Sequence, residues 1–354
     1  MTHCWARWLT AIALFVAALP SAHALDDDEG PHHRAVKVVA NQQLTVKTAA
    51  GTGSVPLYTS ADWTKPLPDI TKAVIVFHGR LRDADVYFRS AQTALAAAGE
   101  AGQGTLLIVP QFLTAADVKT HKLSDATLRW EPTGWMGGEP ALGPASLSSF
   151  DAIDAMVAHL ADRSLFPNLK QIVVAGHSGG GQVVQRYAVV GQGESALKRS
   201  GIHVRYVVAN PSSYAYFTAD RPTAEGTLAP FAAASCAGFN RWKYGMDARP
   251  AYAAKSSPQD LEKEYVHRDV IYLIGDKDTN PKHPALDKSC EAEAQGPHRF
   301  ARGHAYFNYI KSRHKNGFHQ HIYDIPGVGH SGSKMLTSAC GLVALFGDGR
   351  CKSE

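Results

Sequence analysis

The 354-residue sequence lacks a strong charge of either sign. Its formal net charge at pH 7 is only +4, from 36 Lys and Arg against 32 Asp and Glu, and the basic residues form no run. A charge this small argues against nucleic acid as a partner. The chain also lacks internal repeats. Because 45% of its residues are hydrophobic, we expect one large domain with a substantial core.

Long hydrophobic runs are missing beyond the N-terminus. The apolar stretch over residues 8–19 is shorter than the roughly 20 residues that a bilayer crossing needs. Ala22 and Ala24 satisfy the small-x-small rule, so we expect a signal peptide over residues 1–24, cleaved after Ala24. The mature protein, without a membrane span, would be secreted or periplasmic. Its first residues, 25–34, are acidic and then histidine-rich, and we expect them to be disordered.

Cysteines are few, and export would leave four of the five. An even number in an oxidising compartment predicts two disulfides, for which three pairings are possible. We favour Cys340–Cys351, which closes a short loop near the C-terminal end, together with Cys236–Cys290. No cysteine stands at a turn from a strand into a helix, so we do not expect a cysteine nucleophile.

The most informative segment is Gly-His-Ser-Gly-Gly at residues 176–180. It follows a β-forming run at 171–175 and precedes a helical pattern at 181–188. A strand, a sharp turn that carries a serine and a helix together form a nucleophile elbow. Small residues are needed on both sides because the strand and the helix crowd there, and the helix N-terminus favours negative charge near the serine. Ser178 is therefore our candidate nucleophile, the alternative being an idle serine in a glycine-rich turn.

A serine hydroxyl needs a base to take its proton, and the base needs an acid to orient it. The sequence supplies both at strand ends, where the site of a parallel sheet lies. Asp278 follows a predicted strand over residues 269–274, with Asp276 as the reserve for the acid. His330 follows the last predicted strand, residues 319–325, and is our candidate base.

An oxyanion hole requires backbone N–H groups directed at the developing negative oxygen. We expect one from Gly179, which directly follows the candidate nucleophile. The second should come from the loop after an early strand, residues 73–77, which is followed by a His-Gly pair. Arg80 is the first choice for this donor, and Leu81 is the alternative.

These features, from the His-Gly pair through Ser178 and Asp278 to His330, resemble the α/β-hydrolase superfamily. The resemblance covers roughly residues 70–345. It implies a single domain over residues 25–354 in which the three residues act as nucleophile, acid and base. A single glycine follows the histidine, unlike the multi-glycine loop of many lipases.

Predicted strands alternate with helices through most of the chain, which favours a mostly parallel central sheet flanked by helices (class α/β). Two stretches interrupt the alternation: a glycine-rich one at residues 129–138 and a longer one at 211–266. Long insertions are more often functional than accidental, so we expect them to form a substrate wall and a cap. Trp130, Trp135 and Tyr214 are the candidates for substrate contact, with ordinary packing of aromatic rings as the alternative.

Metal-binding patterns are weak. Residues 276–280 have the Asp-x-Asp-x-Asn spacing that begins a calcium loop, but Pro281 stands where the turn needs glycine and no glutamate follows at the twelfth position. His319 and His321 share a strand face without a third ligand at matching spacing. We therefore expect no metal and no cofactor.

Together these patterns predict a secreted serine hydrolase that cleaves carboxylic esters through an acyl-serine intermediate. We expect a monomer acting on a small-molecule or polymeric ester. Two alternatives remain open: an amidase or peptidase with the same triad, and a binding protein that keeps the fold but has lost turnover. A phosphonate probe that failed to label Ser178 would favour the binding protein.

Overall fold

The computed structural model describes residues 1, 30, 32–315, 317–347 and 351. The predicted signal peptide therefore lies outside the described residues, apart from Met1. Within the described part of the chain, no helix combines the length and the apolar composition that crossing a bilayer requires.

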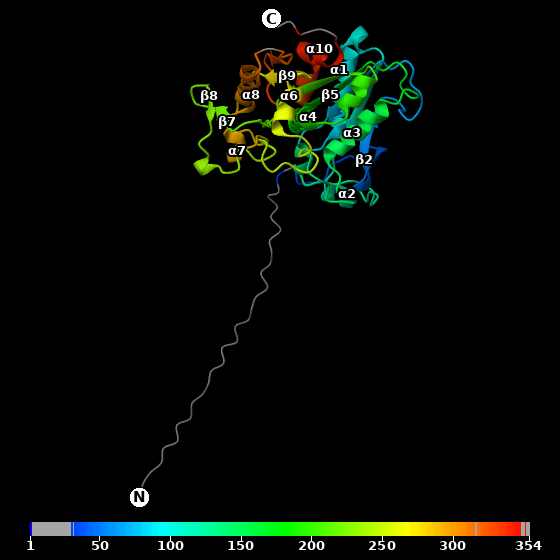
Figure 1. Cartoon of the computed structure of the whole chain (residues 1–354). Coiled ribbons are helices and arrows are strands. Elements are labelled where there is room, and N and C mark those ends of the chain that lie inside the picture. The colour runs from blue at the N-terminus through cyan, green and yellow to red at the C-terminus, as the bar shows by residue number, and fades with distance from the viewer. Residues whose placement is uncertain (2–29, 31, 316, 348–350, 352–354) are drawn as a thin grey trace.

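One eight-stranded sheet runs through the molecule in the order β1-β2-β4-β3-β5-β6-β9-β10 (Figure 1). From β4 to β10 all neighbours are parallel, whereas β1 and β2 are antiparallel at one edge. The central strands are continuous aliphatic runs because both of their faces are buried. The strands are β1 (Gln42–Thr48), β2 (Gly51–Thr59), β3 (Lys72–Phe77), β4 (Thr105–Pro110), β5 (Gln171–His177), β6 (His203–Ala209), β9 (Asp269–Gly275) and β10 (His321–Ile325).

Helices cover both faces of this sheet and form two cores. Helices α3, α4, α6 and α8 pack on one face, and α1, α9 and α10 pack on the other. Side chains alternate along each strand, so in β3 Ile75 enters the first core and Val74 the second. The predicted α/β fold with a mostly parallel, helix-flanked sheet is confirmed. The helices are α1 (Ala84–Ala97), α2 (Ala115–Thr120), α3 (Ser149–Leu160), α4 (Gly179–Val190), α5 (Glu194–Arg199), α6 (Pro258–Tyr265), α7 (Cys290–Glu293), α8 (Arg299–Arg313), α9 (Gly332–Thr337) and α10 (Ala339–Phe346).

The insertion over residues 211–266 contains helix α6 and a hairpin of two short strands, β7 (Asp220–Pro222) and β8 (Leu228–Pro230). Figure 1 shows the hairpin at one side of the sheet, beside α7. A disulfide between Cys236 and Cys290, with sulfurs 2.07 Å apart, ties the insertion to α7. The second disulfide joins Cys340 to Cys351. Both pairings are those favoured from the sequence.

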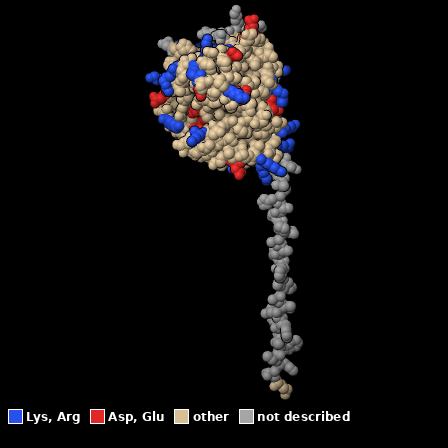
Figure 2. Space-filling view, turned by 90° about the vertical axis from the view of Figure 1, so that its right-hand side faces the viewer, with Lys and Arg blue, Asp and Glu red and all other residues tan. Residues whose placement is uncertain are grey.

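Charged side chains do not gather on the face drawn in Figure 2. Lysine and arginine are scattered there among acidic residues over a mostly uncharged surface. This distribution agrees with the small net charge of the sequence.

Candidate active site

The turn between β5 and α4 holds Ser178 in a conformation that L-residues rarely adopt. Its backbone angles are φ 59° and ψ −118°, and it directly precedes the first residue of α4, Gly179. The Ser178 N–H donates to the carbonyl of Ala209, at the end of β6, over 2.9 Å. Backbone strain of this kind costs of order 1–3 kcal/mol and persists only where the surroundings enforce it.

Two glycines of the motif are required by close backbone contacts. A Cβ atom on Gly176 would lie 2.4 Å from the carbonyl oxygen of Gly180. One on Gly180 would lie 2.2 Å from the carbonyl oxygen of Phe77, in β3. No side chain can be accommodated at these distances, which agrees with the steric reason given for the motif.

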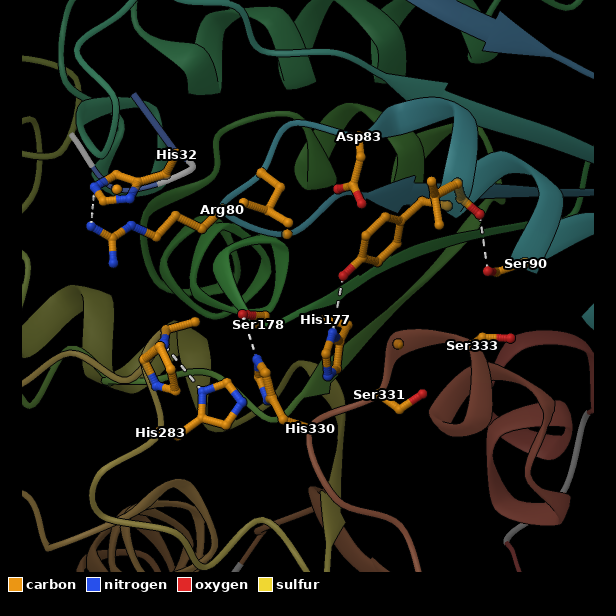
Figure 3. Close-up of a pocket in the computed structure, with 18 residues that line it drawn as sticks. His32, Arg80, Asp83, Ser90, His177, Ser178, His283, His330, Ser331 and Ser333 are labelled. Carbon is orange, nitrogen blue, oxygen red and sulfur yellow. Dashed lines mark hydrogen bonds between the residues drawn. The ribbon is translucent and has the colours of Figure 1, made fainter. Parts of the chain in front are cut away.

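The structure brings Ser178, His330 and Asp278 into one hydrogen-bonded chain. Nε2 of His330 lies 2.9 Å from Oγ of Ser178, and Nδ1 lies 2.7 Å from Oδ2 of Asp278. A dashed line in Figure 3 marks the hydrogen bond between His330 and Ser178. Asp276, the reserve candidate, pairs instead with exposed Lys277 at 3.6 Å. The geometry therefore favours Asp278 as the carboxylate that orients the imidazole.

Asn210, just after β6, links the loops that carry the acid and the histidine. Its Oδ1 accepts a 2.9 Å hydrogen bond from the N–H of Gly275, and its Nδ2 donates to the carbonyl of Gly329 over 3.4 Å. The ends of β6 and β9 and the loop after β10 are thereby tied together. The sequence did not predict this linking role of Asn210, because its hydrogen-bond partners lie 65 and 119 positions away in the chain.

The pKa shifts of Asp278 and His330 favour an ionised carboxylate and a neutral imidazole that can act as a base. Burial alone would raise the pKa of Asp278, but hydrogen bonding to His330 and the charge of buried Arg299, 3.4 Å away, hold it below its usual value. Burial lowers the pKa of His330, and the hydrogen bond to Asp278 only partly opposes this shift. Near neutral pH the carboxylate is therefore ionised and the imidazole is free to accept a proton.

Two backbone N–H groups lie beside the serine without a hydrogen-bond acceptor among the described residues. They belong to Gly179 and Arg80, the two predicted oxyanion donors. A Cβ atom on Gly179 would lie 3.1 Å from the nitrogen of Arg80, so the two groups are neighbours. Leu81, the alternative donor, is half exposed at the mouth of the cavity.

The loop that carries Arg80 is shaped by the buried ring of His78. Nε2 of His78 accepts a 3.0 Å hydrogen bond from the N–H of Phe112. Nδ1 must then carry the proton, and it donates to the carbonyl of Gly79 over 2.8 Å. Burial lowers the pKa of His78 to about 4, so the ring stays neutral and keeps this pattern. The histidine of the His-Gly pair thus positions the loop.

A buried ion pair anchors the same loop from the other side. Nε of Arg82 lies 2.8 Å from Oδ2 of Asp117, and neither side chain is exposed. Arg82 also donates to the backbone carbonyls of His32 and Arg34. Residues 32–34 are therefore anchored against the loop, which corrects the expectation of disorder for this part of the N-terminal segment.

A cavity of about 620 Å³ opens above Ser178, and we refer to it as the reaction cavity. Figure 3 shows His330 directed at Ser178, with His177 and His283 on either side; their ring centres lie 4.6 and 5.0 Å from that of His330. Nδ1 of His177 is 3.0 Å from the hydroxyl of Tyr87, which comes from α1. Tyr87 and His283 were missed from the sequence because neither belongs to a local motif.

The aromatic residues predicted to contact substrate do not reach this cavity. Trp130, Trp135 and Tyr214 are 1%, 0% and 0% exposed. The ring of Trp135 packs 4.7 Å from that of His78, and Tyr214 stacks on Tyr306 at 4.6 Å. These rings support the core beneath the site, which corrects the prediction of direct substrate contact.

The insertion over residues 211–266 does not cover the reaction cavity, since none of its residues lines that cavity. It contributes instead to a second cavity of about 280 Å³, which shares Arg80 and Ala285 with the first. Of the predicted substrate wall and cap, residues 211–266 therefore contribute no lining residue at Ser178. Residues that line the second cavity include Thr133 and Met136 from the glycine-rich stretch, Ser212, Lys243 and Tyr244 from the insertion, and Gln182 from α4.

Among the described residues, one group of three potential metal ligands lies close together. It consists of Cys236, Cys290 and Glu291, and both cysteines are engaged in the disulfide. This group therefore offers no free thiolate to a metal.

No protein-family model and no curated protein matches the sequence. Among solved structures, a poly(3-hydroxybutyrate) depolymerase from Bordetella parapertussis aligns with a TM-score of 0.58 and 20% identity, over 89% of this chain and 94% of that chain. Poly(aspartic acid) hydrolase-1 from Sphingomonas sp. KT-1 aligns with a TM-score of 0.55 and 21% identity, over 84% and 96%. The chain has the α/β-hydrolase fold, as the resemblance of its sequence implied.

Proposed function

We propose that this chain is a serine hydrolase that cleaves carboxylic esters through an acyl-serine intermediate. The observation that carries the proposal is the hydrogen-bonded chain from Ser178 through His330 to Asp278, at 2.9 and 2.7 Å. An idle serine in a glycine-rich turn would not need a strained backbone, an aligned imidazole and a buried carboxylate at once.

In the first half of the reaction, Nε2 of His330 takes the proton of Ser178 while Oγ forms a bond to the acyl carbon. The N–H groups of Gly179 and Arg80 donate to the negative carbonyl oxygen of the tetrahedral intermediate. Asp278 stabilises the imidazolium that forms. The bond from the acyl carbon to the leaving oxygen then breaks, and that oxygen takes the proton from Nε2.

In the second half, His330 takes a proton from a water molecule whose oxygen attacks the acyl-serine. The bond between Oγ and the acyl carbon breaks, and Ser178 recovers its proton from the imidazolium. The products are an acid and an alcohol. All reacting groups come from this one chain, so a monomer suffices and the chemistry needs no cofactor.

Several observations support a substrate outside the cytoplasm. Two disulfides suit an oxidising compartment, and the predicted signal peptide would direct the chain there. We propose that the mature protein is secreted or periplasmic. The named activities of the two structural neighbours concern polymers, one a polyester and the other a polyamide, so a polymeric substrate and amide cleavage both belong in the test.

The test is a panel of esters and amides of graded size, including polymers, assayed with the wild type and with Ser178→Ala. We expect the wild type to cleave esters faster than matched amides, and the variant to fold normally without ester cleavage. Faster cleavage of amides would make the protein an amidase with the same triad. Equal ester cleavage by the two proteins would refute Ser178 as the nucleophile.

A further inference from the structure

The second cavity carries an excess of positive charge beside the oxyanion hole. Its charged lining residues are Arg80, Lys243 and exposed Lys288 against one carboxylate, Asp287. The charged residues that line the reaction cavity are Arg80, which the two cavities share, and Asp83, so that cavity carries no formal excess of positive charge. The charge of the second cavity is not used in the ester chemistry described above.

Lys243 is the central group of this cavity, and its ammonium has no ion pair or hydrogen bond among the described residues. Its Nζ lies 5.9 Å from the centre of the Tyr244 ring. The carboxylate of Asp287 is already engaged, since it accepts hydrogen bonds from the Tyr244 hydroxyl at 2.7 Å and from the N–H of Ser289 at 3.0 Å. Lys243 is partly buried, and the nearby charge of Asp287 acts on it without a direct ion pair, so its ammonium keeps its hydrogen-bonding capacity for an anion that enters the cavity.

Arg80 adds a second unused donor. Its Nε is buried without a hydrogen-bond partner among the described residues, while its Nη2 contacts Nε2 of His32. Arg186, which lies beneath the cavity, is by contrast fully engaged with the carbonyls of Lys243 and Met136 and with neighbouring side chains. The partly buried cations left to meet a ligand are therefore Lys243 and Arg80, while Lys288 is exposed at the same cavity.

The position of this cavity decides which part of a substrate can enter it. The N–H of Arg80 and the sulfur of Met136 lie 3.1 and 3.3 Å from where a Cβ of Gly179 would stand, so the second cavity adjoins the oxyanion hole. His330, which must protonate the leaving oxygen, lines the reaction cavity and not the second one. This arrangement suits a leaving alcohol in the reaction cavity and an acyl chain that extends past the oxyanion hole.

We propose that the second cavity is a subsite for an anionic group on the acyl part of the ester, a carboxylate in the simplest case, bound by Lys243 and Arg80. The inference rests on the proposed function and specifies its substrate class: half-esters of dicarboxylic acids, or acyl chains that end in an acid.

The pKa of Lys243 and of the groups around it makes the proposed subsite testable by its pH dependence. Burial and the charge of Arg186 lower the pKa of Lys243 to about 8, so the ammonium is mostly present at pH 7 and is lost in alkaline solution. The other charged groups that act on it are Asp287, Arg80 and Glu139. Burial opposes ionisation of Asp287, but the charge of Lys243 and its hydrogen bonds hold its pKa below the usual value, so it stays ionised throughout this range.

The experiment compares kcat/KM for monoethyl adipate with that for ethyl hexanoate, a neutral ester of the same acyl length. We expect the wild type to prefer the adipate, and Lys243→Met to reduce this ratio roughly 10- to 100-fold, the value of a charge-assisted hydrogen bond. Lys282→Met is the matched control, because Lys282 is an exposed lysine on the acid loop that lines neither cavity. Its ratio should equal that of the wild type.

Two further arms separate a specific subsite from a general effect of charge. The butyric ester of glycolic acid carries its carboxylate on the alcohol side, and Lys243→Met should not change its rate relative to ethyl butyrate. Between about pH 7 and about pH 9.5 the wild-type preference for adipate should fall as Lys243 loses its proton, whereas Lys243→Arg should keep it.

Equal ratios in Lys243→Met and Lys282→Met would overturn the subsite, as would an equal loss for the glycolate ester. Failure of the wild type to cleave ethyl hexanoate and monoethyl adipate would instead remove the proposed function, and the subsite with it.

Discussion

The elbow and the insertion over residues 211–266 both lie at the active edge of the molecule, but they are built in different ways. The elbow is a short local segment whose strained serine and close glycine contacts follow from a few neighbouring residues. The insertion contains a small hairpin, one helix and a disulfide, and its side chains reach the second cavity and not the reaction cavity. Under the two proposals above, the reaction chemistry belongs to the loops at the strand ends, and the insertion adds Lys243 to the selection of the acyl group.

The largest expected effect on catalysis comes from replacing Asp278, the proposed acid of the triad. Asp278→Asn should lower kcat about 10⁴-fold on every ester, because the amide stabilises the wrong imidazole tautomer and no longer balances the imidazolium. Asp276→Asn, which changes a carboxylate two positions away that pairs with Lys277, should have little effect. Steady-state kinetics with a neutral ester measure both. Equal losses would reopen the choice of acid.

Removal of the disulfide in the insertion should affect stability and spare the chemistry. Replacing Cys236 and Cys290 by serine opens a loop of 54 residues and should lower the free energy of unfolding by about 4 kcal/mol. The same change at Cys340 and Cys351, with a separation of 11, should lower it by about 3 kcal/mol. Urea unfolding gives both values. If folded protein without the first disulfide lost its activity on neutral esters, the separation of the two regions would be wrong.

A single methyl group tests the local construction of the elbow. Gly180→Ala places a Cβ 2.2 Å from the carbonyl oxygen of Phe77, so the turn must shift and kcat should fall about 100-fold, as expected for a misplacement near 1 Å. Gly329→Ala is the matched change next to His330, where the nearest atom would be 3.6 Å away. That variant should remain active, and comparable losses in both would show that crowding is not the reason for Gly180.

The smallest effect concerns the pH dependence of neutral-ester cleavage. The base must be neutral, and burial lowers the pKa of His330, so the acid limb of kcat/KM should have its midpoint below pH 6.5. Activity should therefore persist as pH falls to 6.5 and decline only beyond it. A midpoint above 6.5 would contradict the buried position of the imidazole.

Much of the candidate active site could be predicted from the sequence, because its residues either form a local motif or lie at the ends of parallel strands. The glycines and the serine signal the elbow directly, and parallel strands bring their carboxyl ends to one edge, where Asp278 and His330 meet Ser178. Neither the linking role of Asn210 nor the position of Lys243 in the second cavity follows from sequence, since each depends on contacts between distant segments.

The aromatic residues illustrate the same limit. Trp135 and Tyr214 stand in stretches without a helical or strand period, so the sequence does not tell which way their rings point. In the structure, burial of large apolar surface outweighs exposure at the cavity, and both rings enter the core. Prediction failed where side-chain direction, rather than backbone geometry, determines the outcome.

The most direct test of the central claim, that Ser178 is an activated nucleophile, is covalent labelling of the folded protein with a fluorophosphonate, followed by mass spectrometry of its peptides. We predict one stoichiometric adduct on Ser178, which is absent after heat denaturation and in the Ser178→Ala variant. Folded wild-type protein that cleaves the neutral ester while Ser178 remains unlabelled would contradict the account.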